Sequence, residues 1–441
     1  MFLRKIVLAL MAFLVFSIPL AGGRLSFDLS LGPLGLMSIV GLLAFLFAIA
    51  SLLFGQRGLG RTPVPMDLSV TLFGVFVAFN FASVGWAQDS GVAISKSTDF
   101  IQVFIFVWLL LFLRFEPKSL SIILHAFFLG SVLLVGNALY DIMSIGLDVF
   151  ERQRIGGLDI HVNRFAFKLA LGIPVAFYLS QRGFPGLRWV YLAYVPAAVF
   201  LAFLSGSRTG TVATLFALMA GAWLLLKVEN HKQARFSTKR ALVLGVVGII
   251  VAVSVVPYIS DRFAFHAERV ASVADPLDTA GRSSAQSGLG GRLHLWEYSL
   301  AAYLENPLLG VGSGGSRTAM LDYIGHEGLP ISLAMGGRSV HSAYIAILTE
   351  TGAVGMLLYF AVIASLIIRI RSFPRQEALL FLSLMGVGLI TALAMTNETV
   401  RDFNLALFMS VIFLHLKTQS FGTPIPTVNS RLTERPRAQT G

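Results

Sequence analysis

Cysteine is absent from the 441 residues, and charged side chains are scarce, at 13% of the chain. The first absence excludes a disulfide framework and a thiolate metal site. The second excludes an ordinary soluble domain, in which about 25% of the residues are charged. Hydrophobic residues make up 56% of the chain, and the mean hydropathy is +0.77. The composition therefore predicts an integral membrane protein.

The apolar residues are gathered in runs of about 20 residues, enough for a helix to cross a bilayer core of roughly 30 Å. About twelve such runs occur, at 5–21, 33–54, 67–85, 99–114, 119–146, 164–181, 188–205, 209–226, 240–259, 341–369, 376–396 and 403–417. They predict an all-α polytopic membrane protein with about twelve transmembrane helices. The first run, preceded by Arg4 and Lys5 and followed by Ala21-Gly22-Gly23, also has the features of a signal peptide.

Most of the 34 basic residues lie between alternate runs, with few acidic residues beside them. These basic residues are Arg4, Lys5, Arg57, Arg61, Arg114, Lys118, Arg182, Arg188, Lys227, Lys232, Arg235, Lys239, Arg240, Arg369, Arg371, Arg375, Lys417, Arg431, Arg435 and Arg437. Because cytoplasmic loops carry the excess of Lys and Arg, both termini are expected in the cytoplasm. Topology thus accounts for the net charge of +11, and no nucleic-acid partner is expected.

Four regions follow from this topology. Residues 1–259 would hold transmembrane helices 1–9, and 260–340 a large outer loop between helices 9 and 10. Residues 341–417 would hold the last three helices. The polar, proline-containing tail at 418–441 is expected to be a disordered cytoplasmic segment.

Within the large loop, apolar and aromatic residues recur at helical spacing near 292–305, which predicts an amphipathic helix. Such a helix is expected to lie on the outer leaflet with Trp296, Tyr298 and Tyr303 at the interface.

Polar residues also gather at the outer ends of the predicted helices. Gln88, Asp89, Lys96 and Asp99 are assigned to an outer loop. Arg208 lies in a very short outer turn between two helices, flanked by glycines. An arginine there either extends to the lipid headgroups or binds an anion.

Another basic cluster precedes the tenth helix. If that helix begins near Ser339, then Arg338, His341 and Tyr344 line one side of its first turns. The partial positive charge of a helix N-terminus favours a neutral imidazole, and a neutral imidazole can take a proton from a hydroxyl. His341 is therefore a candidate general base, although a structural histidine is the alternative.

Metal chemistry receives little support from the sequence. His294 and Glu297 have i, i+3 spacing, and His326 and Glu327 lie in the same loop. No HExxH motif or clustered carboxylate pair accompanies them, so no metal and no cofactor is expected. The glycine-rich run 310–316 either offers backbone N–H groups to phosphate or is a flexible connector.

Several stretches together resemble the O-antigen ligase and O-antigen polymerase superfamily of bacterial membrane glycosyltransferases. These stretches are Asn163 with Pro174, Ser205-Gly206-Ser207-Arg208-Thr209-Gly210, Gly291-Arg292 with Trp296, Asn306-Pro307-Leu308-Leu309-Gly310-Val311-Gly312, and His341-Ser342-Ala343-Tyr344 with Glu350, Gly352 and Gly355.

The resemblance implies a GT-C-like fold in the bacterial inner membrane with a periplasmic active site. It also implies a donor glycan on undecaprenyl pyrophosphate and an acceptor that is either lipid A–core or another lipid-linked glycan, with no nucleotide or obligatory metal. By resemblance, Arg208 and Arg292 contact the pyrophosphate and His341 is the base. Arg338 is added from its spacing, and Tyr344, Trp296 and Asn163 as supporting contacts.

Two further functions remain open. Ser342 stands where many ligases carry Asn, which favours a repeat-unit polymerase for O-antigen or exopolysaccharide. A transporter of polysaccharide lipids or anions would use the outer basic cluster as a vestibule, but it would also need polar residues at mid-membrane. Few are present apart from Asp141 and Glu350.

Overall fold

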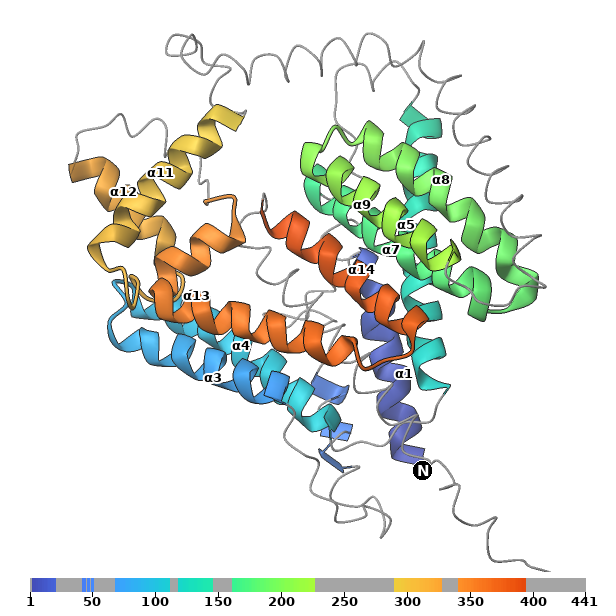
Figure 1. The fold of residues 1–441 in the computed structure, drawn as a ribbon, viewed down its shortest axis with the longest axis horizontal. Helices are drawn as coiled ribbons and strands as arrows, with labels where there is room; N and C mark the ends of the chain where they lie inside the picture. Colours follow the sequence, from blue (N-terminus) through green and yellow to red (C-terminus); the bar gives the residue numbers. More distant parts are fainter. Residues whose placement is uncertain are drawn as a thin grey trace, which may run out of the picture.

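The structure is a computed structural model that describes residues 2–20, 42–44, 46–47, 49–50, 68–111, 118–145, 161–226, 289–326 and 340–393. Every regular element in these ranges is helical, which confirms the predicted all-α class (Figure 1). Seven helices in the described part are long and apolar enough to cross a membrane: Phe2–Leu20, Leu68–Gly85, Ser119–Ser144, Val162–Arg182, Pro185–Leu204, Ala343–Ile370 and Arg375–Ala392. The runs predicted at 240–259 and 403–417, and most of 33–54, lie outside the described residues.

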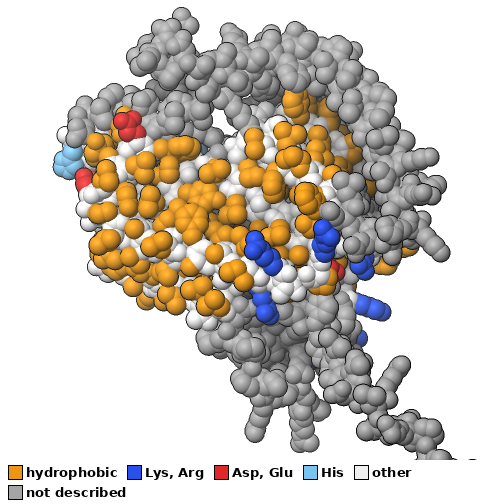
Figure 2. Space-filling view, in the orientation of Figure 1, with side chains coloured by type: hydrophobic (Ala, Val, Ile, Leu, Met, Phe, Trp, Pro, Cys, Tyr) orange, Lys and Arg blue, Asp and Glu red, His pale blue; other side chains and the backbone are white. Residues whose placement is uncertain are grey.

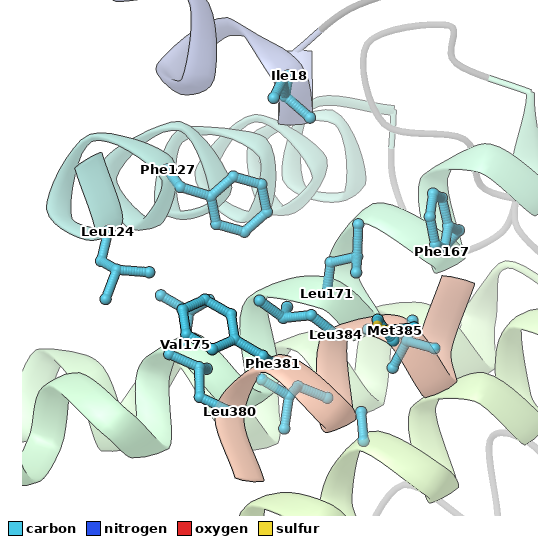
Figure 3. Packing of buried hydrophobic residues seen from close by; sticks show 14 of the residues in the cluster. Ile18, Leu124, Phe127, Phe167, Leu171, Val175, Leu380, Phe381, Leu384 and Met385 are labelled. Atoms are coloured by element: carbon cyan, nitrogen blue, oxygen red, sulfur yellow. The ribbon is translucent and has the colours of Figure 1, made fainter. Parts of the chain in front are cut away.

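One group of helices packs around α7. In it α7 (Val162–Arg182) contacts α5 (Ser119–Ile145), α8 (Arg188–Leu204), α9 (Arg208–Leu226) and α14 (Arg375–Ala392), and α1 (Phe2–Ser17) packs on α5. Because α7 is buried over most of its length, it forms the centre of this group. Figure 3 shows Phe127 of α5, Val175 of α7 and Phe381 of α14 interdigitating in the core.

Small residues set the distance between helices in this group. A Cβ at Gly210 of α9 would collide with Ala166 of α7, and one at Gly221 would collide with the Phe177 ring. Close backbone approach of this kind supplies van der Waals packing where lipid removes the hydrophobic driving force between helices. The glycines therefore fix how α9 lies along α7.

The second group holds α3 (Leu68–Ala82), α4 (Ser90–Leu111) and α13 (Ala343–Ile370), with α11 (Leu289–Glu305) and α12 (Ser316–His326) packed at one end. Figure 1 shows α11 and α12 beyond the start of α13, away from α14. The two groups meet through α13 and α14, which follow each other in the chain and are in contact. Their buried apolar residues form one continuous cluster.

The start of α4 differs from the prediction, which placed residues 88–99 in an outer loop. Asp89 caps the helix, because its Oδ1 accepts a hydrogen bond from the Val92 backbone N–H at 3.0 Å. The helix then continues through Lys96 and Asp99. An Asp before Ser-Gly-Val is a sequence signal for a helix start, and the two charges that follow it concealed that signal.

Charge and apolar surface are separated on the face drawn in Figure 2. Hydrophobic side chains cover most of the described surface, while Lys and Arg gather toward the end where α13 is followed by α14. The visible His and most of the visible Asp and Glu side chains lie at the opposite side, toward α11 and α12, while one acidic patch adjoins the basic group. An apolar belt with a basic end is the pattern expected of a membrane protein.

Candidate active site

The chain enters α13 through a strained residue. His341 has a φ of 54°, and it is the one residue other than glycine with a positive φ in the described part of the chain. The helix begins at Ala343, capped by the Ser342 side chain, which accepts from the Ile345 backbone N–H at 3.5 Å. The prediction that the helix begins near Ser339 is therefore wrong, and His341 and Tyr344 do not share a helical face. The left-handed conformation costs about 1–2 kcal/mol.

Two side-chain hydrogen bonds tie the chain around His341 to neighbouring helices. The Trp296 indole Nε1 of α11 donates to the carbonyl of Val340 at 2.9 Å, and Val340 is buried. The Tyr344 hydroxyl donates to the Leu389 carbonyl of α14 at 2.9 Å. His341, which is partly exposed, thus lies where α11, α13 and α14 are tied together.

Tyr298 of α11 is buried between helices rather than exposed at a membrane interface as predicted. Tyr298 is buried with Leu295 of α11 and with Met320 and Ile324 of α12. Burial raises the pKa of the Tyr298 phenol, and the nearby Glu297 carboxylate adds to the rise. α11 therefore uses one face to pack on α12, while the Trp296 indole reaches toward the start of α13.

Arg208 is the first residue of α9, after a three-residue turn from α8. In that turn Gly206 has a φ of 61°, and Ser207 Oγ accepts from the Gly210 backbone N–H at 3.1 Å. Arg292 lies in the first turn of α11. Only the backbones of these two arginines are described, and Arg338 lies outside the described residues, so a shared arginine pocket stays a prediction.

Asn163 is the second residue of α7, whose first turn is capped by the His161 side chain. The close approach of Gly210 to Ala166 puts the start of α9 beside the start of α7. At the other end of α7, Arg182 Nε donates to Gln376 Oε1 at 2.9 Å near the start of α14. α14 therefore runs antiparallel to α7.

This direction places four predicted residues at one end of the molecule. The last turns of α14, which accept the Tyr344 hydroxyl, lie on the same side as the starts of α7 and α9. Asn163 and Arg208 are thus at the same end as His341 and Tyr344. The structure therefore places the two pairs at a common level.

A buried ion pair at this end was missed by the sequence analysis. Lys96 Nζ of α4 donates to both carboxylate oxygens of Glu350 of α13, at 2.7 and 2.5 Å. Ser316 Oγ of α12 donates to Glu350 Oε1 at 2.7 Å. The Glu350 side chain is 4% exposed and the Lys96 side chain 16%. One signal was available: opposite charges in two apolar helices are costly unless they face each other.

The helix α13 is broken beside this ion pair. Gly352 has a φ of 63° and a ψ of −166°, so the backbone N–H groups of Ala353 and Val354 lose their partners four residues earlier. They donate instead to the carbonyls of Pro307 and Leu308, at 2.9 and 3.2 Å. A Cβ at position 352 would collide with the Leu308 carbonyl. Only glycine satisfies both the conformation and the close approach.

The carbonyls released by the break are also paired. Thr349 accepts from the Val311 backbone N–H and Glu350 from the Gly312 backbone N–H, each at 2.9 Å. Neither interpretation of the glycine-rich run 310–316 fits these bonds, because the N–H groups of Val311 and Gly312 serve α13 rather than a phosphate. The segment is docked on α13 and is not a free connector.

Among the described residues, no three His, Asp or Glu side chains come together as a metal site. Glu327 and the side chain of His294 are not described.

Residues 192–360 match the sequence model of the O-antigen ligase family. The chain is also 22% identical over 269 residues to an uncharacterized protein from Haemophilus influenzae, strain ATCC 51907 / DSM 11121 / KW20 / Rd. That match covers 59% of this chain and 63% of the other protein's length. The match supports the predicted resemblance to the O-antigen ligase and polymerase superfamily over residues 192–360.

Proposed function

We propose that this protein is an inverting, metal-independent membrane glycosyltransferase with a GT-C-like arrangement of about twelve membrane helices. It moves a glycan from undecaprenyl pyrophosphate to an acceptor sugar hydroxyl at the periplasmic face of the bacterial inner membrane. The family match supports the reaction class. The acceptor is lipid A–core for a ligase and a second lipid-linked glycan for a polymerase.

The strained backbone of His341 is the observation that carries this proposal. A non-glycine residue persists in the left-handed region only when its surroundings determine its conformation, and such residues cluster at active sites. Here Trp296, the buried Val340 and the Ser342 cap supply those surroundings. They place a partly exposed imidazole immediately before α13.

In the proposed reaction, the His341 imidazole accepts the proton of the acceptor hydroxyl. The hydroxyl oxygen then bonds to the anomeric carbon on the face opposite the pyrophosphate, and the carbon–oxygen bond to the pyrophosphate breaks. Arg208 and Arg292 stabilise the departing charge through forked, charge-assisted hydrogen bonds. The imidazolium returns its proton to solvent.

Ligase and polymerase remain equal candidates on the residues around His341. On the sequence alone, Ser342 in place of Asn favours a polymerase. Ser342 caps α13, and Asn caps helices equally well. Because either residue serves as the cap, Ser342 does not decide between the two acceptors.

The test is a strain carrying His341→Ala. We expect undecaprenyl-linked glycan to accumulate, with His326→Ala, an exposed histidine of α12, as the matched control. In the gene deletion, unmodified core with carrier-bound long chains identifies a ligase, and core with a single repeat identifies a polymerase. Normal surface polysaccharide in the His341→Ala strain rules out the catalytic role.

A transporter is the second candidate, because a broken apolar helix with a buried ion pair is a feature of transport proteins. The break at Gly352 and the Lys96–Glu350 pair are the observations that favour it. Purified protein in proteoliposomes distinguishes the two functions. Movement of lipid-linked glycan across the bilayer without an acceptor sugar supports transport, whereas glycan transfer only when an acceptor is supplied supports the glycosyltransferase.

A further inference from the structure

Three elements far apart in the sequence converge on the carboxylate of Glu350. Lys96 reaches it from α4, at a separation of 254 residues, and Ser316 reaches it from the first turn of α12. Glu350 itself lies two residues before the break at Gly352. A single side chain thus connects α4, α12 and α13 at the place where the intrahelical backbone hydrogen bonds of α13 are interrupted.

The segment between α11 and α12 that is docked on α13 is also held by hydrogen bonds close to Glu350. Its Ser313 backbone N–H donates to Ser83 Oγ, after α3, at 2.9 Å. On the other side, Thr349 Oγ1 donates to the Ser299 carbonyl of α11 at 3.1 Å. The α11–α12 hairpin is therefore attached to the end of α3, to α4 and to α13 through polar contacts around Glu350.

The charges give this attachment its specificity. A carboxylate without a partner is costly in a low-dielectric region, so Glu350 is stable there only while Lys96 and Ser316 stay in reach. Movement of α12 away from α13 would remove one of the two donor groups. Apolar side chains in place of these groups would tolerate small displacements of α12 from α13, whereas the hydrogen-bonded ion pair does not.

We propose that Lys96, Glu350 and Ser316 are positioning residues that hold the α11–α12 hairpin in register with the start of α13. The hairpin carries Arg292 and Trp296, and Trp296 contacts the backbone before His341. The three residues thereby align the donor-binding arginine with the base. This inference rests on the proposed glycosyl transfer, but the geometric part of it can be tested without that reaction.

The first experiment measures geometry alone. Because the chain has no cysteine, spin labels can be placed at Leu304→Cys on α11 and Leu357→Cys on α13, which are 72% and 69% exposed. We expect one narrow distance distribution in the parent protein and a broad one after Lys96→Met. The charge exchange Lys96→Glu with Glu350→Lys should narrow it again. An unchanged distribution in Lys96→Met overturns the proposal.

The second experiment measures transfer in the same proteins. A displacement of about 1 Å can cost about 100-fold in rate, so we expect Lys96→Met and Glu350→Gln to lower kcat 10- to 100-fold. Lys96→Arg should retain most activity and the charge exchange should recover part of it. Lys5→Met and Glu305→Gln, both exposed, are the matched controls.

The outcomes separate the two proposals. If the single variants and the charge exchange are all inactive while their spin-label distance distributions stay narrow, Glu350 takes part in the chemistry itself. That result overturns the positioning role. A parent protein without transfer activity refutes the proposed function. In that case, broadening in Lys96→Met and its reversal by charge exchange still support the positioning of the hairpin.

Discussion

His341 combines an unfavourable backbone conformation with a side chain that the proposed reaction needs. A selection for stability alone would place glycine at this position, because glycine adopts a φ of 54° without steric cost. Histidine at this strained position therefore supports a functional role for the imidazole. The free-energy cost of the strain can be measured.

Replacing His341 separates stability from activity. His341→Gly should abolish transfer and stabilise the fold by about 1 kcal/mol relative to His341→Ala, because only glycine is free of the left-handed strain. Unfolding of both variants in detergent, followed by the fluorescence of the tryptophans, gives the difference. Equal stability of the two variants would mean that the backbone strain is not present in solution.

Trp296 is a second residue whose role can be separated from packing. Trp296→Phe keeps an aromatic ring but removes the indole N–H that donates to Val340. Loss of one such bond should cost about 1 kcal/mol of stability, and the freed backbone should lower transfer about tenfold or more. Transfer assays with purified protein check this, with Trp223→Phe, an exposed tryptophan of α9, as the control. Parent activity in Trp296→Phe would contradict the positioning of His341 by this bond.

At the scale of elements, α13 is two helical pieces joined at Gly352. Next to Gly352, the backbone groups of α13 form hydrogen bonds with the segment 307–312 rather than within the helix. Gly352 is buried, and the break is tolerated because neighbouring protein satisfies the backbone groups. α13 and the segment between α11 and α12 consequently form one structural unit.

Gly352→Ala should disrupt that unit. The substitution combines left-handed strain with a collision against the Leu308 carbonyl, so we expect a loss of more than about 2 kcal/mol. Yield of folded protein and its thermal midpoint are the measurements. Gly136→Ala in α5, where a Cβ meets nothing within 4 Å, is the control and should be neutral or slightly stabilising. A normal midpoint for Gly352→Ala would show that the break is not required.

At the scale of the whole molecule, two helix groups meet at α13 and α14 (Figure 1). Asn163, Arg208, His341 and Tyr344 lie at one end. The opposite end carries the short connection between α13 and α14, with the exposed Arg369, Arg371 and Arg375. This basic end fits the expected cytoplasmic side. The two ends should therefore be reached from opposite sides of the membrane.

The absence of cysteine makes this orientation measurable with single substitutions. Glu305→Cys, at the end of α11, should react with a membrane-impermeant maleimide added to intact spheroplasts. Arg371→Cys, between α13 and α14, should react only after the membrane is opened. Both positions are exposed, so the parent chain serves as the unlabelled control. The reverse pattern would invert the topology and place His341 in the cytoplasm.

The sequence by itself determined the membrane class, the helical character and the approximate ends of most described helices, because apolar runs and capping residues are local signals. The beginnings of α4 and α13 were predicted wrongly for local reasons as well. Asp89 caps α4, but the charges that follow it favoured a loop. Ser342 caps α13, but Ser339, which also precedes the apolar run, has the same cap signal. Residues near the site could be recognised from motif resemblance.

Only the tertiary structure decided which distant groups meet. The periodicity of the sequence does not predict that Lys96 faces Glu350 or that the segment 307–312 completes the hydrogen bonds of α13. It also does not predict the left-handed backbone of His341. These features depend on which helices are neighbours and on how closely their backbones approach. Such contacts arise from packing over the whole chain, and a local pattern of residues does not contain them.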